Sequence, residues 1–133
     1  MLRSRIMAHA KENKNKNNFR FKQLQDIEKE IPWKDLIEVV SPHYFDANIG
    51  RLWVSAESML RVYFLQLQYG MSAEGVERAL FQVNEFRKFA LIDLDRGVIP
   101  NASDIEYFNS LLVEKSLSSK IEPAFSFKPI TTD

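Results

Sequence analysis

The spacing of apolar residues constrains the fold of this chain more than any other feature. From Phe21 onward, Leu24, Ile27 and Ile31 recur at intervals of three and four, the spacing of one face of an α-helix. A second set follows Pro32, a residue that the first turn of a helix tolerates. Its members are Trp33, Leu36, Ile37 and Val40. The sequence therefore predicts two short helices, one ending at Pro32 and the other ending before the next proline.

Capping residues predict where the later helices begin and end. Ser55 is suited to cap a central helix, Gly70 to end it and Ser72 to cap the next one. Ser103 and Glu106 have the S-x-x-E spacing of a capping box. The apolar residues expected to face the core are Met59, Leu60, Tyr63, Phe64, Leu67, Val76, Ala79, Leu80, Val83, Phe86, Phe89, Ala90, Ile105, Phe108, Leu111 and Leu112.

These elements predict an all-α fold, a single small bundle of about five or six short helices. The turn at Gly70 gives it a hairpin like that of a helix-turn-helix. Residues 1–18, rich in Asn and Lys, are predicted to be a disordered basic arm, and residues 19–122 to be the helical domain. Residues 43–54 are expected to form a loop and residues 123–133 an irregular tail.

Composition excludes several classes of protein. With 133 residues, 45% of them hydrophobic, the chain can build one domain with a core. No apolar run reaches the roughly 18 to 20 residues that cross a bilayer, and no secretory signal follows the basic N-terminus. A cytoplasmic protein without a membrane partner is therefore expected. The absence of cysteine excludes disulfides and cysteine-based zinc sites.

The net charge of zero hides a strong asymmetry along the chain. Residues 1–22 hold seven Lys or Arg and one acid, a net charge of +6, so the remainder carries −6. Such a segment can bind the phosphates of nucleic acid, because lysine and arginine displace condensed counterions. A terminus that is simply solvated is the alternative interpretation.

Residues that could bind metal do not form a recognisable set. His9 and His43 have no carboxylate at ligand spacing, and Asp93, Asp95 and Asp104 lack the pattern of a calcium or magnesium site. No metal, no other cofactor and no catalytic residue is therefore expected.

The helix after Gly70 is a weak candidate for reading DNA bases. Near its start it carries Ala73, Glu74, Glu77 and Arg78, and two carboxylates there would be repelled by phosphates. The arginines and lysines elsewhere in the chain are better candidates for DNA contacts.

Several strings of the sequence resemble one family in the same order. They span residues 31–44, 50–80, 86–94 and 99–117. Their most specific parts are Pro32-Trp33, Pro42-His43-Tyr44, Gly50-Arg51, the run from Met59 to Gln66, and Phe86-Arg87-Lys88-Phe89. Over residues 19–122 the chain resembles the N-terminal domain of bacterial insertion-sequence transposases of the InsH type, the insertion sequence five group.

The resemblance implies a domain that binds DNA at the terminal repeats of a transposon. In the family, a ribonuclease-H-like core with catalytic acids follows, so we expect a chain truncated before that core and not an enzyme by itself. The predicted phosphate contacts are Arg3, Arg5, Lys11, Lys14, Lys16, Arg20, Lys22, Arg51, Arg61, Arg87 and Lys88.

Two other functions stay open. The bundle could be an interaction module in which Trp53, Tyr63 and Tyr69 mediate a homo-oligomer or binding to a full-length transposase. The chain could also be a pseudogene remnant without activity. Salt-sensitive binding to DNA would support the DNA-binding domain, and self-association would support the interaction module. Rapid proteolysis would support the pseudogene remnant.

Overall fold

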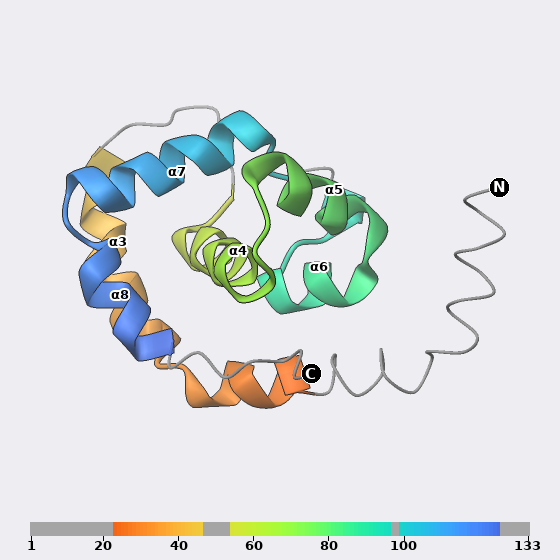
Figure 1. Cartoon of the computed structure of the whole chain (residues 1–133), viewed down its shortest axis with the longest axis horizontal. Coiled ribbons are helices and arrows are strands. Elements are labelled where there is room, and N and C mark those ends of the chain that lie inside the picture. Colours follow the sequence, from red (N-terminus) through yellow and green to blue (C-terminus); the bar gives the residue numbers. More distant parts are fainter. Residues whose placement is uncertain (1–22, 47–53, 97–98, 126–133) are drawn as a thin grey trace, which may run out of the picture.

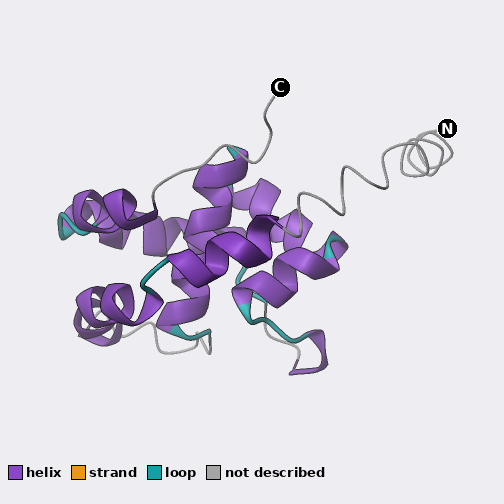
Figure 2. Cartoon of the chain, turned by 90° about the horizontal axis from the view of Figure 1, so that it is seen from below, coloured by secondary structure: helices purple, strands orange, loops and turns teal. Residues whose placement is uncertain are grey.

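The structure of the protein, a computed structural model, describes residues 23–46, 54–96 and 99–125. Within these ranges every regular element is a helix and none is a strand (Figure 2). The prediction of an all-α fold is therefore confirmed. No helix in the described ranges is long and apolar enough to cross a membrane. The predicted disordered arm, residues 1–18, lies outside them.

Helix α4, Ala56–Tyr69, lies at the centre of the bundle with the other helices around it (Figure 1). It begins after Ser55, whose side-chain oxygen accepts a hydrogen bond of 3.0 Å from the backbone N–H of Ser58. It ends at Gly70, in the left-handed conformation with a φ of 64° that favours glycine. Both ends are where the sequence predicts them. Residues 58–66 are all buried, because α4 has neighbours on every side.

The two prolines near the start of the chain act differently. Residues 23–30 form a helix that ends before Pro32, as predicted. Helix α3, Trp33–Asp46, contains Pro42 within it, so the prediction that this helix ends before Pro42 is wrong. The first part of the predicted loop, residues 43–46, is accordingly helical.

Packing of Tyr44 explains why α3 continues past its proline. The Tyr44 hydroxyl donates a buried hydrogen bond of 2.7 Å to the carbonyl of Val54. Its ring meets that of Phe108 edge to face, with 5.7 Å between centroids. These contacts oppose the loss of one backbone hydrogen bond at Pro42, so tertiary packing outweighs the local preference.

Helices α5, Ala73–Gln82, and α6, Asn84–Ala90, follow α4 and are joined by a single residue. Ser72 caps α5 as predicted, accepting a hydrogen bond of 3.0 Å from the backbone N–H of Gly75. Helix α6 ends at Leu91, which adopts the left-handed conformation with a φ of 60°. Of the apolar residues predicted to face the core here, Val76, Leu80, Phe86, Phe89 and Ala90 are buried, and Ala79 and Val83 are half-buried.

Helix α7, Ala102–Glu114, begins with a different capping box from the predicted one. The side chain of Asn101 accepts a hydrogen bond of 2.8 Å from the backbone N–H of Asp104. In return, the Asp104 carboxylate accepts a hydrogen bond of 3.3 Å from the backbone N–H of Asn101. The prediction that Ser103 and Glu106 form this box is wrong, because the chain enters the helix two residues earlier. The apolar residues of this helix that were predicted to face the core are all buried, namely Ile105, Phe108, Leu111 and Leu112.

Two elements have no counterpart in the sequence prediction. One is the short 3-10 helix η1, Leu94–Arg96, and the other is helix α8, Ser118–Phe125, which contains Pro123. Residues at the start of the predicted irregular tail are thus helical up to Phe125. Ile121 and Phe125, four positions apart, are both buried, and this pair explains why the helix extends beyond its proline.

The core is built around aromatic rings from four helices. The ring of Phe64 on α4 meets that of Phe125 on α8 edge to face at 5.1 Å. Trp33 on α3 meets Phe89 on α6 at 5.8 Å. Leu67, which was predicted to face this core, is 39% exposed near the end of α4. The aromatic contacts therefore join α3, α4, α6 and α8 into one body.

Candidate nucleic-acid interface

The hairpin of α4 and α5 offers few groups to a DNA groove. Of the four residues at the start of α5, Ala73 is buried. The Glu77 carboxylate accepts a hydrogen bond of 3.1 Å from the backbone N–H of Ala102, which ties α5 to the start of α7. Glu74 and Arg78 remain exposed. One carboxylate and one guanidinium form a poor surface for reading bases, in agreement with the sequence argument.

The predicted phosphate contact Arg61 is buried, with 5% of its surface exposed. Its Nη1 atom donates to the Glu28 carboxylate at 2.5 Å and to the carbonyl of Phe89 at 3.0 Å. Its Nε and Nη2 atoms donate to the Glu57 carboxylate at 3.1 and 2.8 Å. The guanidinium carbon lies 4.5 Å from the centroid of the Trp33 ring. Hydrogen bonds, charge pairing and ring stacking thus surround this cation on several sides.

The prediction that Arg61 contacts phosphate is therefore wrong. A guanidinium is stable away from water only where its N–H groups are bonded and its charge is paired, and the structure provides both conditions. Through these contacts Arg61 joins helix 23–30, α3, α4 and α6. The sequence did contain one signal of this role, because Glu57 precedes Arg61 by the four residues of a helical ion pair. The participation of Glu28, 33 residues away, had no such signal.

Arg87 caps the preceding helix. Its Nη1 atom donates to the carbonyls of Leu80 and Phe81 at 2.7 and 2.9 Å, and its Nη2 atom to the side chain of Asn84 at 3.3 Å. Carbonyls in the last turn of α5 have no partner within the helix and carry its partial negative charge, which a cation stabilises. The half-buried Arg87 therefore has a structural role, although its charge stays near the surface.

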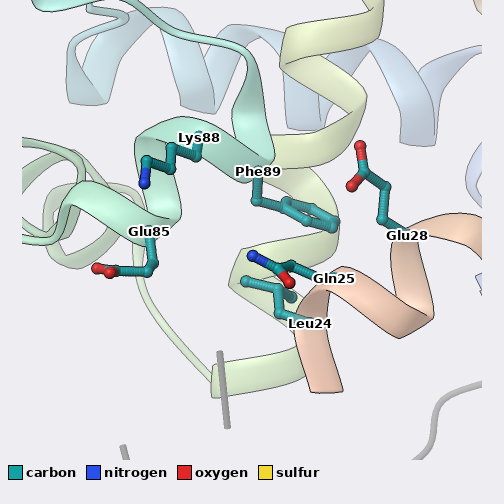
Figure 3. Close-up of a pocket in the computed structure, with 6 residues that line it drawn as sticks. All are labelled: Leu24, Gln25, Glu28, Glu85, Lys88 and Phe89. Atoms are coloured by element: carbon teal, nitrogen blue, oxygen red, sulfur yellow. The ribbon is translucent and has the colours of Figure 1, made fainter. Parts of the chain in front are cut away.

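Lys88 is exposed on α6 and belongs to the lining of a pocket between α6 and helix 23–30 (Figure 3). The residues that line this pocket are Leu24, Gln25, Glu28, Glu85, Lys88 and Phe89. The structure thus brings Lys88 beside the first described turn of helix 23–30, which the basic residues 1–22 precede in the sequence. Neither the spacing nor the composition of the sequence indicated this proximity.

The pocket itself does not suit a small-molecule substrate. Its volume is about 120 Å³, below the roughly 300 Å³ at which typical ligand pockets start. Two carboxylates, of Glu28 and Glu85, share its wall with one ammonium group, so an anion would also meet net negative charge.

The candidate metal ligands of the sequence are distributed over separate local structures. The Asp93 carboxylate accepts a hydrogen bond of 2.9 Å from the backbone N–H of Asp95, and Asp104 belongs to the capping box of α7. His43 is half-buried in α3, whereas His9 lies outside the described residues. Within the described ranges, no group of three His, Cys, Asp or Glu side chains is arranged to hold a metal.

The described part of the chain is acidic. It contains nine Lys or Arg and sixteen Asp or Glu, a net charge of −7. Of the predicted phosphate contacts, only Arg61, Arg87 and Lys88 belong to it. The others, Arg3, Arg5, Lys11, Lys14, Lys16, Arg20, Lys22 and Arg51, lie outside the described residues.

The aromatic surface suggested for oligomerisation is largely internal. The Tyr63 hydroxyl donates a hydrogen bond of 2.6 Å to the Glu122 carboxylate, and burial together with this bond raises the pKa of Tyr63 well above its ordinary value. Tyr69 is half-buried, with its ring 5.0 Å from that of Phe86. Trp53 lies outside the described residues. Tyr63 and Tyr69 therefore contribute to the packing of the bundle.

Comparison with known protein families matches residues 8–111 to a family described as Transposase domain (DUF772). The match covers most of the chain, from the basic N-terminal segment to the buried Leu111 of α7. No solved structure matches the chain.

Proposed function

Because this chain belongs to the family of transposase domains, we propose that it binds the DNA ends of a transposable element through its basic side chains. In this proposal the domain holds DNA and leaves strand cleavage to a catalytic core of the kind that the insertion-sequence transposases possess. The family membership supports the transposase-related role, and the arrangement of charge supports the mode of DNA binding.

One observation carries the proposal: exposed Lys88 lies beside the first described turn of helix 23–30. Seven lysines and arginines occur in the 22 residues that lead into this helix, the last of them Lys22. Leu24 and Gln25, just after Lys22, share a pocket with Lys88. In this proposal Lys88, a cation of the described body, adds to the phosphate contacts of the basic residues that precede helix 23–30 in the sequence.

The charge of the body restricts where DNA approaches. A net charge of −7 on the described residues opposes the approach of phosphates to this part of the chain. In this proposal binding depends on the basic residues of the N-terminal segment and on Lys88. Phosphate contacts of this kind fix the position of DNA and carry no sequence information, so preference for a terminal repeat should be modest.

Fluorescence anisotropy with a labelled DNA duplex of about 30 base pairs tests the proposal. We expect the full chain to bind with a Kd that rises steeply with salt, with a logarithmic slope of about 5 for roughly six phosphate contacts. Replacing all seven basic residues of the N-terminal segment by glutamine should abolish most of this binding. Arg78→Gln on the exposed side of α5 is the control and should change Kd by less than about threefold. The proposal is wrong if the full chain does not bind at low salt, or if the sevenfold variant binds equally well.

A second function, self-association or binding to a full-length transposase, is favoured by exposed apolar side chains. Phe81 is 57% exposed at the end of α5, and Leu91 is 53% exposed at the end of α6. Exposed aromatic side chains are typical of protein contacts. Light scattering over a range of concentrations tests this alternative, with Phe81→Ser expected to shift any dimer toward monomer. A monomer at every concentration that does not copurify with the transposase contradicts it.

A further inference from the structure

The last described helix, α8, is attached to the body along a single face. Leu117, Ile121 and Phe125 recur at every fourth position, and none of them has more than 2% of its surface exposed. The helix follows α7 and lies at the edge of the bundle beside α3 (Figure 1). A helix of eight residues is not stable alone in water, so α8 depends on this docking for its own structure.

The surface that receives α8 is formed by three rings, which we call the α8 seat. They are the rings of Trp33 on α3 and of Tyr63 and Phe64 on α4. The ring of Phe125 lies 6.0 Å from that of Trp33 and 6.2 Å from that of Tyr63, between centroids. The Glu122 carboxylate accepts the hydrogen bond of 2.6 Å from the Tyr63 hydroxyl. Side chains of α8 therefore make both the apolar and the polar contacts with the seat.

The joint between α7 and α8 holds a residue in an unfavourable conformation. Ser116 is exposed and has a φ of 56°, in the left-handed region. The backbone N–H of Ser116 donates to the carbonyl of Val113 at 3.0 Å, and that of Leu117 donates to the carbonyl of Leu112 at 2.7 Å. This pair of bonds ends a helix in the Schellman motif, where glycine is the usual left-handed residue. A serine at this position strains the joint, because its Cβ crowds the backbone.

A single conformational change at Ser116 would release the strain. With a right-handed helical φ at this residue, α7 continues into α8, and α8 is carried away from its own seat. The seat and the apolar face of α8 are then both uncovered. An open monomer of this kind is unfavourable, since the rings of the seat become exposed to water.

We infer that α8 is an exchangeable element, and that its seat also binds the α8 of a second copy of this chain. In the resulting dimer, each copy places its α8 on the seat of the other. A second copy is the partner that fits, because it carries the same Phe125 and Glu122 and so restores the contacts with the rings and with the Tyr63 hydroxyl. Only the joint differs between the two states, and strained joints favour exchange of this kind. The inference does not depend on DNA binding.

The dimer contains two joints, and this number gives the inference a quantitative signature. The cost of association opposes the dimer, whereas relief of strain at both copies of Ser116 favours it. A substitution that changes the joint by a given factor therefore changes the Kd of the dimer by the square of that factor. Association through an exposed patch elsewhere on the surface would not respond to the joint in this way.

Sedimentation equilibrium of the full chain tests the inference, at protein concentrations from about 1 µM to about 1 mM. Samples are refolded from urea at each concentration, so that exchange reaches equilibrium. We expect the wild type to form dimer in the upper part of this range. Ser116→Gly relaxes the joint of the monomer by about fivefold and should raise Kd about 25-fold. Ser116→Ala favours a continuous helix by about twofold per joint and should lower Kd about fourfold.

Two substitutions serve as controls. Ser110→Gly makes the same chemical change at an exposed position inside α7, where it weakens the helix equally in monomer and dimer. Phe81→Ser removes the exposed ring at the end of α5, far along the chain from the joint. Both should leave Kd within about twofold of the wild type.

Tryptophan fluorescence gives a second measurement that needs no change at the joint. Trp33 belongs to the seat, and a Trp53→Phe background makes it the sole tryptophan of the chain. Because each seat is filled in both states, the emission of Trp33 should be the same in monomer and dimer. A dimer that forms with α8 displaced would shift this emission to longer wavelength and would contradict the exchange.

The remaining outcomes are equally decisive. A monomer at every concentration overturns the inference, and so does a dimer whose Kd changes by less than about twofold in Ser116→Gly. A dimer that dissociates in Phe81→Ser assigns self-association to the surface of α5 and overturns it as well. The proposed DNA binding is measured separately, with a duplex, and stands or fails independently of these results.

Discussion

Replacing Arg61 with methionine separates a buried structural cation from a DNA contact. Methionine has a similar length and can remain between the rings of Trp33 and Phe89, but it has no charge and no donor. The structure predicts that this variant loses stability. A surface arginine that binds phosphate would instead lose DNA affinity and keep its stability.

The magnitude follows from the contacts of the guanidinium. Removing one partner of a buried ion pair costs roughly 3–5 kcal/mol. The side chains of Glu28 and Glu57 are 34% and 31% exposed, so water can hydrate both carboxylates in the variant. Their contribution to the loss of stability is therefore smaller than that of fully buried carboxylates. The buried carbonyl of Phe89 loses its side-chain donor, at about 1–3 kcal/mol. We expect the free energy of unfolding to fall by about 3 kcal/mol, and Tm by roughly 15 °C.

Urea denaturation followed by far-ultraviolet circular dichroism measures this loss, with Arg78→Met on exposed α5 as the control. The control should change the free energy of unfolding by less than about 0.5 kcal/mol. Arg61→Lys keeps the charge but not the forked geometry, so it should fall between the two. A loss below about 1 kcal/mol for Arg61→Met, accompanied by weaker DNA binding, would refute the buried role of this side chain.

Three further predictions concern the fold. Burial, and then the charge of Asp104, raise the pKa of Tyr44 from 10.0 to about 12. The contribution of Tyr44 to stability should therefore be full below pH 10 and be lost between pH 10 and about 12, and Tyr44→Phe should make the decline over that range less steep in urea titrations at several pH values. Asn101→Ala should destabilise the protein by about 1 kcal/mol and Ser103→Ala by much less, because only Asn101 caps α7; equal losses in urea would contradict this. Gly70→Ala should cost about 1 kcal/mol, measured as a lower Tm, since its φ of 64° strains any residue with a Cβ.

Sequence reasoning succeeded at most positions where the deciding interactions are local, although it misplaced the capping box of α7 by two residues. Ser55, Gly70 and Ser72 satisfy backbone groups within a few residues of themselves, so the ends of α4 and the start of α5 were predictable. It failed at Pro42 and Pro123, where a local rule predicted no helix. Contacts of Tyr44 with Val54 and Phe108, and burial of Phe125 against α4, stabilise helix at those positions, and such partners are distant along the chain.

The candidate site likewise has one feature that the sequence predicts and others that depend on the fold. The cluster of positive charge in residues 1–22 is a property of composition, and the sequence alone established it. The roles of the three described candidates depended on their surroundings. Arg61 and Arg87 had the residue type of a phosphate contact, but one lies inside the bundle and the other caps a helix.

The sequence by itself determined an all-helical domain, the ends of its central helix, and the basic segment ahead of an acidic body. These properties depend on residue type and on interactions between neighbours along the chain. Only the tertiary structure decided that Arg61 is buried between Glu28 and Glu57, and that Lys88 lies beside Leu24. Burial and long-range pairing arise from how helices pack, and because distant segments supply the partners, no local pattern encodes them.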